Sequence, residues 1–305
     1  MTHLVEQLLN GVQFGVMLFL MAAGLTLVFG IMNLINLAHG SLYMIGAYVA
    51  AAVFGATGSF LLGLALAIAA AMGLGHVIEI AVFRRLYARD HLDQVLATFG
   101  LILFFDEIVR MLWGSTALYM PVPGYLSGRV QILPGSAYPV YRLAIVAVGL
   151  ALAGLLYMLI ARTRLGMLIR AGASNRVMLG ALGVNVRLLY TLVFVLGAGL
   201  AALAGSMAGP IFTVESGMGE GVLILAFVVI VIGGIGSVRG AFVAALLVGI
   251  VDAVGRAYLR PLLGLAMSRA AADNAGPALA SMLIYLVMAA VLFVRPQGLF
   301  PPRGR

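Results

Sequence analysis

The stretch Arg162–Arg187, RTRLGMLIRAGASNRVMLGALGVNVR, contains five of the chain's eighteen basic residues and no acidic residue. Long apolar segments precede and follow it. Basic residues close to the ends of membrane spans mark the cytoplasmic side of a bilayer. This stretch therefore predicts the direction in which the chain crosses the membrane. It is also the largest surface that the sequence offers to a cytoplasmic partner.

The composition predicts a membrane protein. The chain has 305 residues, of which 64% are hydrophobic and 9% are charged, whereas a soluble domain has roughly 45–50% apolar and about 25% charged residues. Apolar runs of about 20 residues recur, and each could cross a ~30 Å hydrocarbon core as a helix. A β-barrel would alternate apolar and polar residues, unlike LLGLALAIAAAMGLG at 61–75.

We therefore predict an all-α polytopic membrane protein. It would form one transmembrane domain over residues 1–305, with about 8–10 helices, broken or re-entrant segments and a cytoplasmic coupling helix. The apolar segments read from the sequence are 8–30, 37–56, 60–83, 94–113, 140–161, 186–209, 221–236, 240–258 and 278–294.

The arginines orient these segments. With 162–187 inside, alternation places twelve arginines inside and six outside or near outer span ends. The N-terminus is then outside and the C-terminus cytoplasmic. The remaining inner arginines are Arg84, Arg85, Arg89, Arg239, Arg295, Arg303 and Arg305.

Two absences from the sequence exclude several function classes. The chain has no cysteine, so it has no disulfide or thiolate metal site. Every basic residue is arginine, and a P-loop needs lysine, so ATP hydrolysis by that route is excluded. The four histidines are too widely spread for metal ligation. We expect no metal, no bound cofactor, no nucleic acid and no enzymatic activity.

A polar interruption lies within FGIMNLINLAHGSLYMIGAYVAA at 29–51. A break at membrane depth must be buried in protein or line a wet cavity, and split helices often line transporter substrate sites. The alternative is a short turn with asparagine capping and His39 bonded to backbone. The residues concerned are Asn33, Asn36, His39, Gly40 and Ser41, followed by Tyr43.

A second interruption, within VVIVIGGIGSVRGAFVAALLVGI at 228–250, is rich in glycine. Several glycines within eight residues break or bend a helix, or allow two backbones to approach closely. The residues are Gly233, Gly234, Gly236, Ser237 and Gly240.

Charged residues inside the spans come with opposite charges nearby, at spacings that place them on one helix face. We interpret the first group as an interfacial cluster whose side chains reach water. The groups are His76 and Glu79 with Arg84 and Arg85; Asp106 and Glu107 with Arg110; and Asp252 with Arg256. The outer loop at about 114–139 is too apolar for a free linker, so we expect it to fold onto the bundle.

The Arg162–Arg187 stretch has the end signals of short helices. We expect Thr163, Ser174 and Asn185 to cap helix starts, and Gly183 to end the second short helix. Met178, Leu179 and Leu182 are predicted to share one apolar face. That face would dock a soluble partner or lie on the headgroups.

Four blocks in order resemble the LivH family, the permease subunits of branched-chain amino acid type ABC importers. They are FGIMNLINLAHGSLYMIGAY (29–48), TRLGMLIRAGASNRVMLGALGVN (163–185), VIGGIGSVRGAFVAALLVGI (231–250) and VRPQGLF (294–300). Together they extend over nearly the whole chain. IEIAVFRR at 78–85 also looks like a family segment, with Arg85 where proline is usual.

The resemblance implies a multi-part importer in the bacterial inner membrane. Its other parts would be a LivM-like permease, two LivG- and LivF-like ATPases that use ATP and Mg²⁺, and a periplasmic substrate-binding protein. The ATPase-coupling residues would come from Arg164, Arg170, Ala171, Asn175, Met178, Leu179, Gly180, Leu182 and Gly183.

The substrate pathway would lie at the two interruptions and work by alternating access. Many family members have A-H-G-E where this chain has Ala38-His39-Gly40-Ser41. A branched-chain or other hydrophobic amino acid is the expected solute, with urea, amides or aromatic and other organic acids as the alternative. An autonomous secondary transporter or channel is a remoter alternative.

Overall fold

The computed structural model describes residues 2–87, 89–133 and 136–300. Arg303 and Arg305, which are predicted to be cytoplasmic, are not among the described residues. Residues 134–135 of the outer loop are not among them either. The helices are α1 (Thr2–Met32), α2 (His39–Thr57), α3 (Phe60–Ile78), π-helical η1 (Glu79–Phe83), α4 (Arg84–Leu86), α5 (His91–Trp113), 3₁₀-helical η2 (Gly124–Leu126), α6 (Val140–Arg162), α7 (Arg164–Ser174), α8 (Arg176–Ala181), α9 (Val186–Ala208), α10 (Met218–Gly233), α11 (Val238–Leu263) and α12 (Arg269–Val294).

The all-α polytopic prediction is confirmed. Within the described ranges seven helices are long and apolar enough to cross a membrane. These are α1, α2, α3 continued through η1 and α4, α6, α9, α11 and α12. The α10 helix is apolar but shorter, with 16 residues. Each of the nine apolar segments read from the sequence corresponds to a helix, α5 and α10 included.

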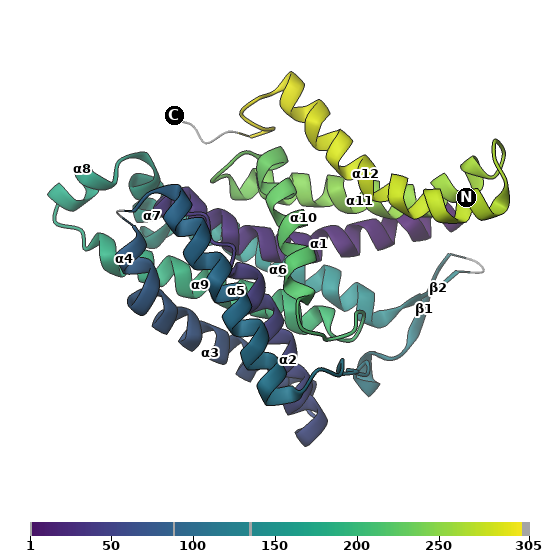
Figure 1. Cartoon of the computed structure of the whole chain (residues 1–305), viewed down its shortest axis with the longest axis horizontal. Coiled ribbons are helices and arrows are strands. Elements are labelled where there is room, and N and C mark those ends of the chain that lie inside the picture. The colour runs from purple at the N-terminus through teal and green to yellow at the C-terminus, as the bar shows by residue number, and fades with distance from the viewer. Residues whose placement is uncertain (1, 88, 134–135, 301–305) are drawn as a thin grey trace.

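Helix α1 forms the centre of the bundle. The side chains from Val16 to Ala23 are all at most 4% exposed, and α1 packs against α11, α9, α10 and α6. Figure 1 shows α4, α7 and α8 at one end of the molecule, and the N-terminus with the β-hairpin toward the other. The arginine-rich segments 84–89 and 162–187 therefore share one end of the bundle.

The outer loop folds onto the bundle, as expected, but it also contains strands that the sequence did not indicate. Strands β1 (Arg129–Leu133) and β2 (Ser136–Pro139) pair antiparallel. Leu118 forms a bridge with Val214, and Met120 is buried. Burial raises the pKa of the Tyr138 phenol, which therefore stays protonated and donates to Asn10 Oδ1 at 3.1 Å.

Helices α2 and α9 cross with their backbones in contact. A Cβ at Gly205 would overlap the carbonyl oxygen of Tyr43, and one at Gly46 would overlap the Cα of Ala202. Small residues allow such crossings in membranes, where van der Waals packing drives helix association. This crossing fixes the position of α2 and therefore of the polar segment that begins it.

We predict that Gly205→Ala destabilises the protein, although alanine is the better helix former by about 1 kcal/mol. The added methyl group would force the two backbones apart, and overpacking typically costs about 1–3 kcal/mol. Gly73→Ala is the control, because nothing lies within 4 Å of its added Cβ. Thermal unfolding in detergent should show a lower midpoint for Gly205→Ala alone. Equal midpoints would contradict the close crossing.

Candidate functional site

The first interruption separates α1 from α2. Asn33 ends α1 with φ of 51°, a left-handed conformation that asparagine tolerates better than most residues. The N-cap position of α2 is Ala38, and no side chain caps this helix. The capping role considered for asparagine here is therefore wrong.

The polar residues of this segment are buried without full hydrogen bonding. Asn36, His39 and Ser41 are at most 4% exposed. His39 bonds the backbone of Met21, as one interpretation of the sequence expected. Within the described chain, both amide atoms of Asn36, Nε2 of His39 and Oγ of Ser41 have no hydrogen-bond partner. Such groups are costly to bury, so they are candidates for contact with a polar solute.

The second interruption lies between α10 and α11. Gly234 and Gly236 have φ of 99° and 84°, which favour glycine. Ser237 accepts a hydrogen bond from Gly240 N–H at 3.1 Å and caps α11. The final block VRPQGLF returns to this point, where Leu299 N–H donates to Ile232 O at 2.8 Å and Phe300 N–H donates to Gly233 O at 3.0 Å. The tail thus satisfies carbonyls that the end of α10 leaves free.

The structure brings the two interruptions together. A Cβ on Gly30, near the end of α1, would lie 3.0 Å from the Cα of Gly236. At the start of α2, a Cβ on Gly40 would lie 2.7 Å from the carbonyl oxygen of Gly219, which is at the opposite end of α10 from the second interruption. Tyr43, also predicted for the pathway, lies in the apolar core and is 2% exposed.

Two acidic residues lie close to Ser41, where many family members carry glutamate. A small pocket is lined by Ser41 together with Asp106 of α5 and Glu220 of α10. Arg110 does not pair with Asp106 as the spacing suggested. It bonds Glu107 at 3.0 Å and Ser216 at 3.1 Å. No basic group of the described chain lies within 4.0 Å of the Asp106 or Glu220 carboxylate.

The helix caps in the stretch Arg162–Arg187, the predicted coupling segment, are mostly those expected from the sequence. Thr163 accepts from Gly166 N–H at 3.1 Å, and Asn185 accepts from Leu188 N–H at 3.1 Å. Gly183 has φ of 83° and follows the end of α8. The prediction for Ser174 is wrong, because Asn175 caps α8 by accepting from Met178 N–H at 2.9 Å. Asparagine adopts the extended Ncap conformation while Ser174 completes α7.

The three apolar residues predicted to share one face, Met178 and Leu179 of α8 and Leu182 at its C-cap, do not do so. Met178 and Leu182 are 58% and 74% exposed, whereas Leu179 is 5% exposed. Leu179 turns inward because α8 packs against α7 and α9. The exposed pair remains available to a partner.

Leu179 of α8 and Ile31 near the end of α1 both lie close to Gly172 of α7. A Cβ at Gly172 would lie 3.4–3.5 Å from methyl groups of Leu179, Ile31 and Leu189. Side chains of α1, α8 and α9 therefore meet at this glycine, and Ile31 precedes Asn33 by two residues. The sequence analysis missed Gly172 and Ile31. The small residues of the stretch AGAS at 171–174 were the available signal.

The other predicted coupling residues lie around this junction. Arg164 starts α7 and is exposed, as is Gly180 of α8. Ala171 is partly buried against the core. The guanidinium of Arg170 turns back along α6 and donates to the carbonyl of Ile160.

Glu79 is structural, and it does not reach water as the sequence interpretation expected. It is 0% exposed. Arg84 Nε lies 3.2 Å from Oε2, Thr191 Oγ1 donates to Oε2 at 2.8 Å, and Tyr87 Oη donates to Oε1 at 2.9 Å. Burial, and next the Glu79 charge, raise the pKa of the Tyr87 phenol, which stays protonated. Nothing in the sequence marked Thr191 as a partner.

We predict that Arg84→Gln lowers the stability of the protein. The buried carboxyl group of Glu79 would lose its arginine partner, and leaving a buried polar group without a partner typically costs about 1–3 kcal/mol. Arg85→Gln is the control, because this substitution removes the same charge at an exposed position. The unfolding midpoint should fall for Arg84→Gln only. A similar fall for Arg85→Gln would indicate a general charge effect.

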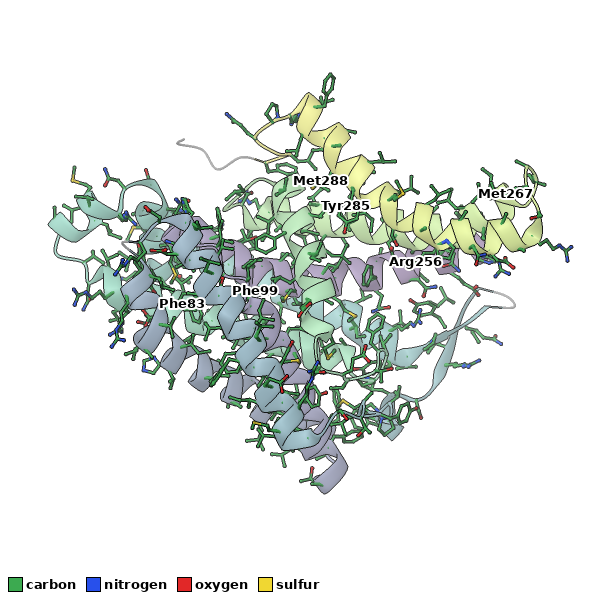
Figure 2. All side chains as sticks on the ribbon, viewed as in Figure 1. Phe83, Phe99, Arg256, Met267, Tyr285 and Met288 are labelled. Carbon is green, nitrogen blue, oxygen red and sulfur yellow. The ribbon has the colours of Figure 1, made fainter. Side chains whose placement is uncertain are left out.

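Asp252 is also paired, as its spacing predicted. Arg256 Nε donates to both of its carboxylate oxygens, at 2.8 and 2.9 Å. Figure 2 labels Arg256 on α11. The paired acids Glu79 and Asp252 thus differ from Asp106 and Glu220, which have no such partner.

A bundle whose broken helices meet inside the apolar region, with a cationic segment packed on one of them, has the architecture of the membrane component of a transport system. The chain belongs to the family described as "Branched-chain amino acid transport system / permease component", which matches residues 7–292. It is therefore a permease component, and the LivH resemblance is confirmed.

Individual relatives align over most of their length. The chain is 30% identical to the high-affinity branched-chain amino acid transport permease BraD of Pseudomonas aeruginosa, over 97% of this chain and 95% of that protein. It is 32% identical to the LivH permease of Escherichia coli, over 84% and 87%. A probable LivH of Methanocaldococcus jannaschii is 25% identical over 93% and 88%. No solved structure matches.

Proposed function

We propose that this permease passes a branched-chain or other hydrophobic amino acid into the cytoplasm by alternating access, driven by separate ATPase subunits. The observation that carries the proposal is the junction at Gly172. There Leu179 of α8 and Ile31 near the end of α1 both lie next to Gly172 of α7, within 3.4–3.5 Å of a Cβ added to that glycine. A partner that moves α8 would therefore also move the residue next to the first interruption.

The ATPase subunits would bind the exposed side of the same helix. Met178 and Leu182 present apolar side chains to the outside of the bundle, and Arg176, the first residue of α8, is also exposed. The ATPases would bind ATP and Mg²⁺, since this chain has no lysine for a P-loop. ATP-driven motion would then open the interruptions alternately to the two sides of the membrane.

We predict that Met178→Asp with Leu182→Asp abolishes ATPase co-purification and uptake. A carboxylate in an apolar contact must be desolvated without a partner, which is strongly unfavourable. Tyr119→Asp, at an 85% exposed position in the outer loop, adds the same kind of charge elsewhere and serves as control. Unchanged assembly and uptake in the double variant would remove α8 from the mechanism.

The proposed solute follows from the relatives and from the acids near Ser41. Several relatives are named as branched-chain amino acid permeases. Asp106 and Glu220 lie in the pocket that contains Ser41. Two carboxylates favour a cationic group and disfavour an anion, so they fit the ammonium of an amino acid better than an organic acid. Ser41 in place of glutamate therefore does not remove all carboxylates from this region.

We predict that Asp106→Asn lowers uptake of leucine at least several-fold in a reconstituted importer, because a neutral amide binds an ammonium group less strongly than a carboxylate does. ATPase co-purification should stay unchanged. Glu107→Gln is the matched control, since Glu107 pairs with Arg110 outside the pocket. Transport of benzoate or urea by the wild-type importer, without transport of leucine, would overturn the assignment of the solute.

The proposed assembly places the other subunits on distinct surfaces. The ATPases would bind the end that carries α4, α7 and α8, which we assign to the cytoplasm with the C-terminus, so the N-terminus lies outside. A second, LivM-like permease would pack on this chain, and a periplasmic binding protein would deliver solute to the opposite end. Large apolar side chains on α5 and α12, such as Phe99 and Tyr285 (Figure 2), are 52% and 42% exposed and face lipid or the second permease.

An autonomous secondary transporter is the alternative. It would need acids free to bind a coupling ion. Glu79 and Asp252 are held by Arg84 and Arg256, which leaves Asp106 and Glu220 as the acids that could serve this alternative. Uptake into liposomes that contain this chain without ATPases would favour this alternative.

A further inference from the structure

A cavity separate from the pocket at Ser41 is lined in part by Gly236 and Ser237 of the second interruption. It has a volume of about 1030 Å³ and lies between α1, α6, α7 and α11. This is at the upper end of the range for small-molecule sites, roughly 300–1,000 Å³. Its walls are mainly apolar, with Phe19, Leu27 and Ala153 among the lining residues. Leu150 and Val243 on opposite walls are 49% and 41% exposed, so the cavity meets the outer surface of the bundle.

Two arginines from different helices converge at one end of this cavity. Arg239 of α11 donates from Nη2 to Tyr157 Oη at 3.1 Å, and its guanidinium carbon lies 4.8 Å from the centre of the Tyr157 ring. Arg170 of α7 donates to the carbonyl of Ile160. Tyr157 and Ile160 are three residues apart on α6, so they are neighbours on its surface. Both cations are thus attached to one turn of α6.

Among the described residues, no acid pairs with either arginine, Arg170 or Arg239. Guanidinium groups bind phosphate and carboxylate through a planar set of donors, and neutral partners such as Tyr157 Oη and a carbonyl use only part of that set. Two guanidinium groups that bond to the same turn of α6 beside an apolar cavity favour a ligand with an anionic head and an apolar body.

We propose that the cavity binds one anionic phospholipid. Its phosphate would lie between Arg170 and Arg239, and an acyl chain would extend between α1, α6 and α11. Both arginines belong to the set that the sequence assigns to the cytoplasmic side, where anionic lipids attract basic residues. The lipid would join α7 to the start of α11 beside Ser237, and so would stabilise the contact between the coupling segment and the second interruption.

The first test uses the purified chain and native mass spectrometry after delipidation, with phosphatidylglycerol or phosphatidylcholine added back. Wild type should retain one phosphatidylglycerol in preference to phosphatidylcholine. Arg239→Gln should bind phosphatidylglycerol about 5-fold more weakly, the effect expected of one basic residue near an anionic surface. Arg85→Gln, which removes an exposed arginine at the same end, should bind it as wild type does.

The second test fills the cavity. Gly154 lines it, and nothing lies within 4 Å of a Cβ added there, so Gly154→Phe would occupy the acyl space without a backbone clash. It should abolish retention of the lipid. Gly73→Phe is the control, since Gly73 also has open space around it and lies outside the cavity.

Three results would overturn the proposal: equal retention of the two lipids by wild type, unchanged phosphatidylglycerol binding in Arg239→Gln, or displacement of the lipid by leucine. Displacement would assign the cavity to the solute. ATPase co-purification and leucine uptake are measured separately, so failure of the lipid site leaves the transport proposal to its own tests.

Discussion

A helix that ends inside a hydrocarbon layer leaves backbone groups without partners, and lipid cannot supply them. This chain interrupts its apolar helices twice, and much of its structure serves to bury those ends. The carbonyls at the end of α10 accept hydrogen bonds from Leu299 and Phe300 of the C-terminal tail. Ser237 caps the start of α11. The final sequence block VRPQGLF is therefore as much a part of the second interruption as the glycines that form it.

A close backbone contact connects this interruption with the end of α1. Gly30 approaches Gly236 at a separation that a side chain would prevent. The end of α1 is thus in contact with the second interruption at Gly30, and with the coupling segment at Ile31. Packed interiors transmit displacements because they have little free volume. In the proposed transport cycle, a movement of α8 would therefore be transmitted through α7 and the end of α1 to both interruptions.

The acidic residues of the helices fall into two groups, according to whether an arginine forms a salt bridge with them. Glu79 accepts bonds from Thr191 and Tyr87 and pairs with Arg84, and Asp252 accepts from Arg256, so the charges of both are compensated within the fold. An uncompensated charge in a bilayer is expensive and usually faces a wet or functional region. Asp106 and Glu220 belong to that second group. The spacing of Arg110 suggested that Asp106 was neutralised, but Arg110 bonds Glu107 and Ser216 instead.

The sequence by itself determined the helical membrane class, the position of each apolar segment, the caps at Thr163 and Asn185 and the permease family. These depend on local composition, local hydrogen bonds and ordered motifs, which a linear pattern records. It could not determine which residues meet across the bundle. Three features depend on contacts between different segments of the chain. Leu179 is buried, Thr191 donates a hydrogen bond to Glu79, and Arg170 and Arg239 both bond to α6. Only the tertiary packing decides them, because the burial of a side chain is fixed by its neighbours in space.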